Sequence, residues 1–197
     1  MATPLIAGAS LAGTSISAIL SSLEHKVASV ILTENWTQWT LEDPIAYPDD
    51  GLIIIPPMII QPGHKEAMVA RNKGFTFCGT YGTVSWKVTP SSRESRRVVV
   101  MWSSPFNHIF NKNHLAIGIT KPGDTVHEKD MFEKMYSGQQ GNLKCYLKEK
   151  YFEKTVTISL EDDDLMISGN MGSGHRNAIT IVIQPKTADT KLPQKID

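Results

Sequence analysis

The sequence predicts a mainly β fold: a single β-sandwich flanked by two α-helices. Short β-branched segments recur through most of the 197 residues, with turn residues between them, and this spacing is typical of a sandwich or barrel. Helical spacing of apolar residues is confined to two segments, 4–26 and 124–136. Apolar residues make up 41% of the chain and charged residues 20%, which are ordinary values for one globular domain.

The N-terminal segment, residues 1–26, is predicted to contain an amphipathic helix. Its apolar face repeats at the helical period and consists of Leu5, Ala9, Ala12, Ile16, Ile19 and Leu23. Its opposite face is rich in hydroxyl groups and consists of Ser10, Thr14, Ser17, Ser21 and Glu24. From Leu5 to Leu23 such a helix is about 27 Å long, close to the roughly 30 Å hydrocarbon thickness of a bilayer. A helix that packs on the core by its apolar face is the alternative.

From residue 27 the pattern becomes that of β-strands, and residues 27–185 are predicted to form the sandwich. The predicted strands are 27–33, 36–46, 52–60, 67–71, 75–88, 97–103, 114–120, 144–152, 155–160, 165–168 and 178–183. Pro56 and Pro57 predict a break or an edge within the third strand. The second helix, 124–136, has Asp124 as its predicted cap and Gly138 as its stop. Residues 186–197 are polar and are predicted to be a loose tail.

Several polar and sulfur-containing features have predicted environments. Residues 91–97 are predicted to be a solvated hairpin tip. The acidic run 161–164 lacks the spacing of a calcium loop, so it is predicted to be a solvated turn. Cys78 and Cys145 are predicted to be buried free thiols, with a single disulfide as the alternative.

The charge and motif content argues against several classes of protein. The 20 basic and 20 acidic residues cancel, whereas a nucleic-acid binder usually has a basic excess. The six histidines lack metal-ligand spacing, and no nucleotide-binding or protease motif is present, so we expect no enzyme, metal site or cofactor. No apolar run is long enough for a constitutive transmembrane helix. The N-terminus lacks the basic region of a signal peptide, which indicates either a mature secreted, soluble form or a protein that is not exported by that route.

The segment after the strand 97–103 is a loop with unusually many large side chains. They are Phe106, His108, Ile109, Phe110 and His114. Exposing such side chains to water is unfavourable unless they have a purpose, and aromatic rings favour the membrane interface. We therefore expect this loop to contact a membrane, with a loop folded over the core as the alternative. Its two histidines suggest binding that depends on pH near 6, with ordinary loop polarity as the alternative.

Short motifs in a fixed order resemble those of the actinoporin family of pore-forming toxins. Residues 100–107, Val-Met-Trp-Ser-Ser-Pro-Phe-Asn, are similar to the family's strand-and-loop segment around Ser-Val-Pro-Tyr-Asp-Tyr. Residues 131–137, Met-Phe-Glu-Lys-Met-Tyr-Ser, are similar to its helix Met-Tyr-Glu-Glu-Leu-Tyr-Tyr. Shorter similarities lie at residues 8–11, 39–41, 79–84 and 173–175. Together they extend from about residue 8 to residue 185, nearly the whole chain.

The resemblance implies a sandwich of about ten strands and a pore-forming mechanism. Monomers bind lipid headgroups, assemble into a homo-oligomer on the membrane and insert the N-terminal helix, whose polar face lines the pore. The family's phosphocholine site falls here on Asp50, Tyr81, Ser103, Pro105, Asn111, Phe132, Tyr136 and Ser137. Aromatic faces attract a quaternary ammonium group, and several of the family's rings are replaced in this chain, which argues against a strict sphingomyelin preference. Only Glu24 is acidic on the polar face, so we expect at most weak cation selectivity.

A lipid- or carbohydrate-binding, lectin-like module without pore formation is the alternative function, because a fold does not fix a function. The N-terminal segment discriminates between the two. A lectin has no use for a charge-poor helix of bilayer length.

Overall fold

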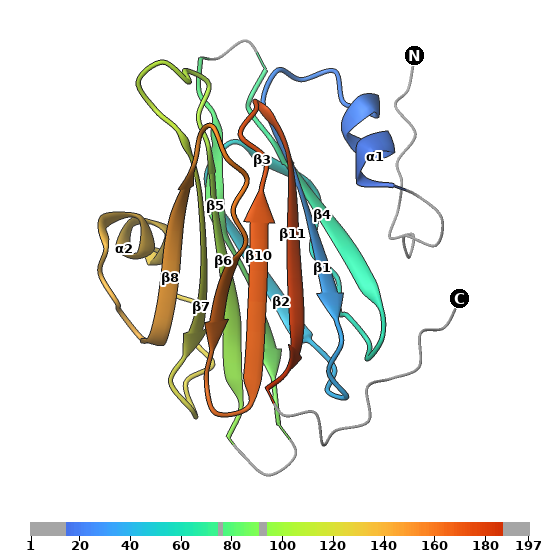
Figure 1. Cartoon of the computed structure of the whole chain (residues 1–197), viewed down its shortest axis with the longest axis vertical. Helices are drawn as coiled ribbons and strands as arrows, with labels where there is room; N and C mark the ends of the chain where they lie inside the picture. Colours follow the sequence, from blue (N-terminus) through green and yellow to red (C-terminus); the bar gives the residue numbers. More distant parts are fainter. Residues whose placement is uncertain (1–14, 75–76, 91–93, 187–197) are drawn as a thin grey trace.

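The computed structural model describes residues 15–74, 77–90 and 94–186. In chain order the elements are α1 (Ile16–Ser22), β1 (Ala28–Asn35), β2 (Glu42–Asp50), β3 (Leu52–Ile55), β4 (Lys65–Arg71), β5 (Thr80–Val88), β6 (Arg96–Ser104), β7 (Asn113–Thr120), α2 (Met131–Ser137), β8 (Leu143–Tyr151), β9 (Ile158–Glu161), β10 (Leu165–Met171) and β11 (Arg176–Pro185). Within these described residues the strands form two sheets that pack face to face, with one helix outside each (Figure 1). The predicted mainly β sandwich with two flanking helices is confirmed, with eleven strands in the described chain in place of about ten.

The strand order fixes which loops lie together. The six-stranded sheet has the order β3-β4-β1-β11-β10-β9, and the five-stranded sheet has the order β2-β5-β6-β7-β8. β1 and β11 are parallel neighbours, with Ala28 opposite Arg176. Both strands therefore begin at the same end of the sandwich, which we call the entry end. The loop 105–112 also lies there, because the hydroxyl of Ser104 is hydrogen-bonded to that of Ser29 at 2.8 Å.

The main core lies between the two sheets. Along β10 and β11, buried residues alternate with half-buried ones, as the period of two in a strand requires. Trp86 and Trp102 are the largest buried side chains. Their indole N–H groups donate to the carbonyl of Met58 at 2.9 Å and to the hydroxyl of Thr80 at 3.2 Å, so neither leaves an unpaired donor in the core.

α1 packs on the outer face of the six-stranded sheet through a second, smaller apolar cluster. Ile19 is buried in it, and Ile16, Leu20 and Leu23 are partly buried. The strand residues beneath them are Val30, Leu32, Ala67 and Val69. The hydroxyl of Ser15 caps the helix by accepting a hydrogen bond from the amide of Ala18 at 3.2 Å. Since none of these residues belongs to the main core, α1 covers a side cluster and not the interior.

α2 lies outside the five-stranded sheet, with Met131 and Met135 buried against it. The helix ends at Gly138, whose φ of 88° is left-handed, so the predicted stop is confirmed. The predicted start is wrong. Asp124 does not cap a helix, because its carboxylate instead accepts a hydrogen bond from the amide of Val126 at 3.0 Å in a turn. No helix among the described residues is long and apolar enough to cross a bilayer.

The end opposite the entry end, which we call the far end, contains buried charges. Arg96 is fully buried at the start of β6, and its guanidinium pairs with the carboxylates of Asp162 and Asp164. The expectation of solvated segments at 91–97 and 161–164 is therefore wrong for Arg96 and for Asp162, which is also buried. Burying one charge favours burying its partner, because an unpaired charge in the interior is strongly unfavourable.

Arg97 is also buried, and it belongs to a polar network that includes a histidine. Its guanidinium pairs with Asp43 and donates to the hydroxyl of Ser85 at 3.0 Å. The two ring nitrogens of His127 lie 2.9 Å from the hydroxyl of Ser85 and 2.8 Å from that of Thr83. Burial, together with the charge of Arg97, lowers the pKa of His127 to about 4. The expectation that residue 97 is solvated is therefore also wrong, because the guanidinium of Arg97 is buried in this network.

The start of β2 and the burial of the cysteines also differ from expectation. β2 begins at Glu42 and not at residue 36, because the side-chain amide of Asn35 holds the intervening loop by donating to the carbonyl of Trp39 at 2.7 Å. β3 ends directly before the Pro56-Pro57 pair, as expected. Cys78 is exposed and Cys145 is half-buried, and both are free thiols. The prediction of burial is wrong for Cys78, and the alternative disulfide is not formed.

Candidate functional site

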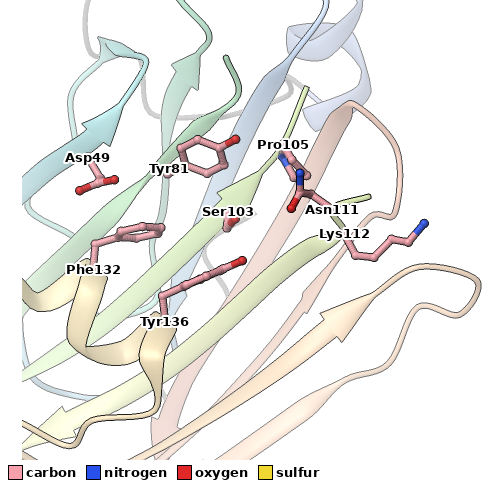
Figure 2. A pocket seen from close by; sticks show the side chains of 8 residues that line it. All are labelled: Asp49, Tyr81, Ser103, Pro105, Asn111, Lys112, Phe132 and Tyr136. Carbon is pink, nitrogen blue, oxygen red and sulfur yellow. The ribbon is translucent and has the colours of Figure 1, made fainter. Parts of the chain in front are cut away.

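A cavity of about 240 Å³ opens at the entry end between α2 and the five-stranded sheet (Figure 2). Its lining consists of Asp49, Tyr81, Ser103, Pro105, Asn111, Lys112, Phe132 and Tyr136. Six of these residues belong to the set that the resemblance implied, and the other two are Asp49 and Lys112. The volume suits a small polar headgroup rather than a whole lipid.

Three aromatic rings form the wall on the α2 side. Phe132 and Tyr136 are four residues apart, so they lie on one face of the helix, with ring centroids 5.6 Å apart and planes at 20°. Tyr81 of β5 lies across from them, 6.0 Å from the ring of Phe132. Figure 2 shows the three rings around one space, with Ser103 at its base. Such ring faces attract a positively charged group that lacks hydrogen-bond donors.

Gly79 holds the ring of Tyr81 in place. A Cβ atom at this position would lie 2.1 Å from the carbonyl oxygen of Ser104 and 2.6 Å from the hydroxyl of Tyr81. Only glycine therefore lets the chain approach β6 and the phenol this closely. Burial raises the pKa of Tyr81, so its hydroxyl stays neutral and keeps its proton for donation.

The charged groups lie at the rim of the cavity. Asp49 is exposed at the end of β2. The ammonium group of Lys112 donates to the carbonyl of His108 at 2.6 Å and lies 3.5 Å over the ring of Phe152. Figure 2 shows the lysine side chain extending away from the three rings. Lys112 therefore does not cover the three rings, whereas the ammonium group of Lys148 lies 5.3 Å from the centroid of the Tyr136 ring.

Two of the residues implied by the resemblance do not line the cavity. Asp50 pairs with Lys73 at 2.9 Å and accepts a hydrogen bond from the amide of Gly51 at 2.7 Å. Its neighbour Asp49 supplies the carboxylate instead. Ser137 is exposed, and its hydroxyl donates to the carbonyl of Lys134 at 3.3 Å.

The loop 105–112 presents two apolar side chains to water beside this cavity. Ile109 is 80% exposed and Phe110 is 81% exposed. Asn107 shapes the turn that carries them, because its carboxamide oxygen accepts a hydrogen bond from the amide of Ile109 at 2.9 Å and its carbonyl accepts one from Asn111 at 3.2 Å. A backbone held in this way keeps two large apolar groups in solvent.

The remaining large side chains of the loop pack against neighbours. Phe106 is half-buried, and His108 stacks on His175 with centroids 3.9 Å apart and planes at 6°. His114 contacts the ring of Tyr136 edge-on at 5.2 Å. Burial lowers the pKa of both His108 and His114, and the nearby charges of Lys112, and of Lys148 and Lys150, act in the same direction.

Phe77 is an exposed aromatic residue that the sequence analysis missed. It is 89% exposed and contacts the edge of Phe106, with centroids 5.4 Å apart. The sequence placed it inside a predicted strand, whereas β5 begins at Thr80. The glycines on either side, Gly74 and Gly79, indicate a loop at this position and could have predicted the exposure of Phe77.

The predicted pore-forming segment is described only in part. Leu5, Ala9, Ser10, Ala12 and Thr14 lie outside the described residues. Of the predicted apolar face, Ile19 is buried and Ile16 and Leu23 are half-buried. The predicted polar face is exposed at Ser17, Ser21 and Glu24. The described part of the segment is therefore amphipathic in the predicted sense.

The sandwich with a helix outside each sheet places the chain in a known structural class. A crystal structure of the lipid-binding protein Nakanori aligns with 85% of this chain and 76% of its own, with a TM-score of 0.65 and 10% sequence identity. This likeness concerns the fold alone. No protein-family model matches the chain.

Curated relatives identify the family. Tereporin-Ca1 from Terebra anilis is 34% identical over 197 residues, which cover 95% of this chain and 99% of the relative. Tereporin-Ts1 from Terebra subulata is 35% identical over 175 residues, covering 86% and 82%. Echotoxin-2 from Monoplex parthenopeus is 31% identical over 192 residues, covering 95% and 67%. The chain belongs to the actinoporin-like family of pore-forming toxins.

Proposed function

We propose that this protein is secreted, binds a choline-type lipid headgroup in the cavity beside α2, assembles into oligomers on the membrane and forms a pore with its N-terminal segment. The observation that carries the proposal is the position of the aromatic cavity directly beside the exposed Ile109 and Phe110. A headgroup in the cavity and apolar side chains in the bilayer then engage one membrane surface together.

The chemistry of the cavity supports a quaternary ammonium ligand. Tyr81, Phe132 and Tyr136 offer ring faces, and a trimethylammonium group gains from cation–π attraction without needing hydrogen-bond acceptors. The carboxylate of Asp49 adds a negative charge at the rim. The hydroxyls of Ser103 and Tyr81 are the available donors for the phosphate that follows the choline.

The attachment of α1 supports its role as the mobile part. It is held by the side cluster around Ile19 and not by the main core. Its departure exposes four strand residues but leaves the contact between the two sheets unchanged. Bilayer hydrocarbon takes up the apolar face of the helix, which compensates for the lost contact with the sheet.

Dye release from liposomes tests the proposal directly. The intact protein is added to phosphatidylcholine vesicles with and without sphingomyelin, and a variant lacking residues 1–26 is tested in parallel. We expect release with the intact protein, and vesicle binding without release for the deletion variant. Soluble phosphocholine in excess should reduce both binding and release.

The deletion also separates the proposal from a lectin-like module. If a folded intact protein binds vesicles or sugars but releases no dye from any mixture, the pore-forming role is wrong and a binding module remains. If the deletion variant releases dye as fast as the intact protein, the N-terminal segment is not the pore-forming element.

A further inference from the structure

Two arginines flank the point where the chain enters the sandwich. Ala28, the first residue of β1, lies opposite Arg71 of β4 and opposite Arg176 of β11. Directly paired residues in neighbouring strands project from the same face of a sheet. Alternation along β4 puts Arg71 on the face of Ala67 and Val69, which contact α1. Both guanidinium groups therefore lie on the outer face, next to the base of α1.

The two arginines are close enough to share one ligand. Neighbouring strands are about 4.8 Å apart, so the Cα atoms of Arg71 and Arg176 are separated by roughly 10 Å. Ala28, which is fully buried, is the strand residue between them on this face. Two long side chains that start this far apart can turn inward and contact one small anion.

Neither arginine has an acidic partner in the part of the chain that the structure describes. Nη1 of Arg71 donates to the carbonyl of Asn72 at 2.9 Å, and Nε of Arg176 donates to the carbonyl of His25 at 3.1 Å. Each guanidinium carries five N–H donors, so most of them remain available. This differs from Arg96 and Arg97, whose guanidinium groups pair with carboxylates.

Two further basic residues lie in the linker between α1 and β1. The pKa of His25 is lowered, first by burial and then by the charge of Arg71, with Arg176 acting in the same direction and Glu24 opposing them. The ammonium group of Lys26 lies 4.0 Å over the ring of Phe106. The basic cluster is therefore continuous with the aromatic residues of the entry end, which the proposed function places at the membrane.

We infer that Arg71, Arg176 and His25 form a second binding site, distinct from the aromatic cavity, that takes the phosphate group of an acidic headgroup. One guanidinium group can donate two parallel hydrogen bonds to two oxygens of a phosphate. The second guanidinium group, on the other side of Ala28, supplies donors for the remaining oxygens. The inference rests on the proposed function for the orientation of the entry end toward lipid.

The site also touches the linker that α1 must move. Because Arg176 holds the carbonyl of His25, a phosphate that draws on the same guanidinium acts on the segment through which α1 is attached. A headgroup bound at this position therefore weakens the hydrogen bond between Arg176 and the linker. The cavity beside α2 has no such contact with the linker, because it lies outside the other sheet.

Vesicle binding with a double variant tests the inference. Full-length protein and its Arg71→Gln/Arg176→Gln variant are sedimented with phosphatidylcholine vesicles that contain or lack phosphatidic acid. We expect phosphatidic acid to increase the vesicle affinity of the wild type. Each arginine near an anionic surface contributes about fivefold to affinity, so the increase should be about 25-fold smaller for the double variant. Binding to neutral vesicles should be unchanged.

Lys121→Gln is the matched control, because Lys121 is exposed and follows β7 at the far end. β7 spans 8 residues, about 27 Å at about 3.4 Å each, which exceeds a Debye length of about 10 Å at 0.1 M salt. The control should lose less than about twofold in affinity. An Arg71→Lys/Arg176→Lys variant keeps the charges and should retain part of the gain if the glutamine variant fails to fold.

Inorganic phosphate distinguishes the two sources of the ligand. A shift of the His25 ring signal in solution, seen with the wild type and absent in the double variant, indicates a site that also takes free phosphate. A response only to vesicles indicates a headgroup site that needs the membrane. An undiminished phosphatidic acid gain in the folded double variant overturns the inference, whereas no binding to any vesicle overturns the proposed function instead.

Discussion

Arg96 and Asp162 form an ion pair in which both side chains are fully buried, although 66 residues separate them along the chain. Asp164 contacts the same guanidinium at 2.7 Å. The pair joins β6 of one sheet to the turn between β9 and β10 of the other, so it closes the far end of the sandwich. The entry end is also held together, by the stacking of His108 on His175, but it presents Ile109 and Phe110 to solvent.

Replacing Arg96 with methionine should destabilise the fold strongly. The variant leaves Asp162 buried without its partner, and removal of one member of a buried pair typically costs about 3–5 kcal/mol. Urea unfolding measures the free energy of unfolding. Lys144→Met is the control, because Lys144 pairs with the exposed Asp163 and such pairs contribute about 1 kcal/mol or less. Equal losses in the two variants contradict the assignment.

His127 should make the protein less stable in acid. Its pKa falls from an ordinary 6.5 to about 4 in the fold, so the unfolded chain binds more protons between these values and stability falls as pH falls through the window. At about 1.4 kcal/mol per pKa unit, the loss approaches 3 kcal/mol near pH 4. Unfolding titrations from pH 7 to 4 measure it.

The pH dependence can be assigned to His127 by substitution. His127→Asn should lower stability at pH 7, because it breaks the hydrogen bonds to Thr83 and Ser85, and should flatten the decline with pH. His64→Gln, at an exposed position, should leave the slope unchanged. A slope that persists in His127→Asn points to the half-buried histidines His108 and His114.

Phe110→Ser should weaken membrane binding without weakening the fold. Full burial of such a side chain gives about 1.5–3 kcal/mol, so we expect vesicle affinity to fall by roughly 10- to 100-fold and the melting temperature to stay constant. Val126→Ser is the control, because Val126 is also exposed but lies at the far end. A matching loss in the control would show that exposed apolar residues contribute wherever they lie.

The ring of Tyr136, and not its hydroxyl, should support choline binding. Tyr136→Ala is expected to weaken inhibition by soluble phosphocholine by about tenfold, since cation–π contacts contribute about 0.5–2 kcal/mol. Tyr136→Phe keeps the ring and should bind nearly as well as the wild type. Titration calorimetry with phosphocholine measures both variants, and a similar loss in both would assign the role to the hydroxyl.

Features with a local sequence signal could be predicted. The alternation of β-branched residues predicted most of the strands. The Pro56-Pro57 pair predicted the end of β3, and Gly138 predicted the end of α2. Six residues of the cavity came from the resemblance, whose two longest motifs brought Ser103 and Tyr136 together in one proposal. In the structure these two residues line one cavity.

Features that depend on contacts between distant segments could not be predicted. Arg96 and Asp162 each look like members of solvated charged runs, and only the packing of the two sheets buries them together. Asp49 was missed in favour of Asp50, because a shift of one residue in a strand reverses the side on which a side chain lies. The bulge in register between Pro48 and Asp50 makes that shift invisible in the sequence.

The parallel pairing of β1 with β11 has a practical consequence for how the protein is handled. The chain enters β1 at Ala28 at one end and leaves β11 at Pro185 at the other. In Figure 1 the start of β1 and the loop 105–112 lie toward the same end. A surface anchor or a fluorescent partner joined after β11 therefore starts from the side opposite the exposed aromatic residues. Protein tethered in this way presents its entry end outward, which suits force and flow-cell measurements on supported lipid.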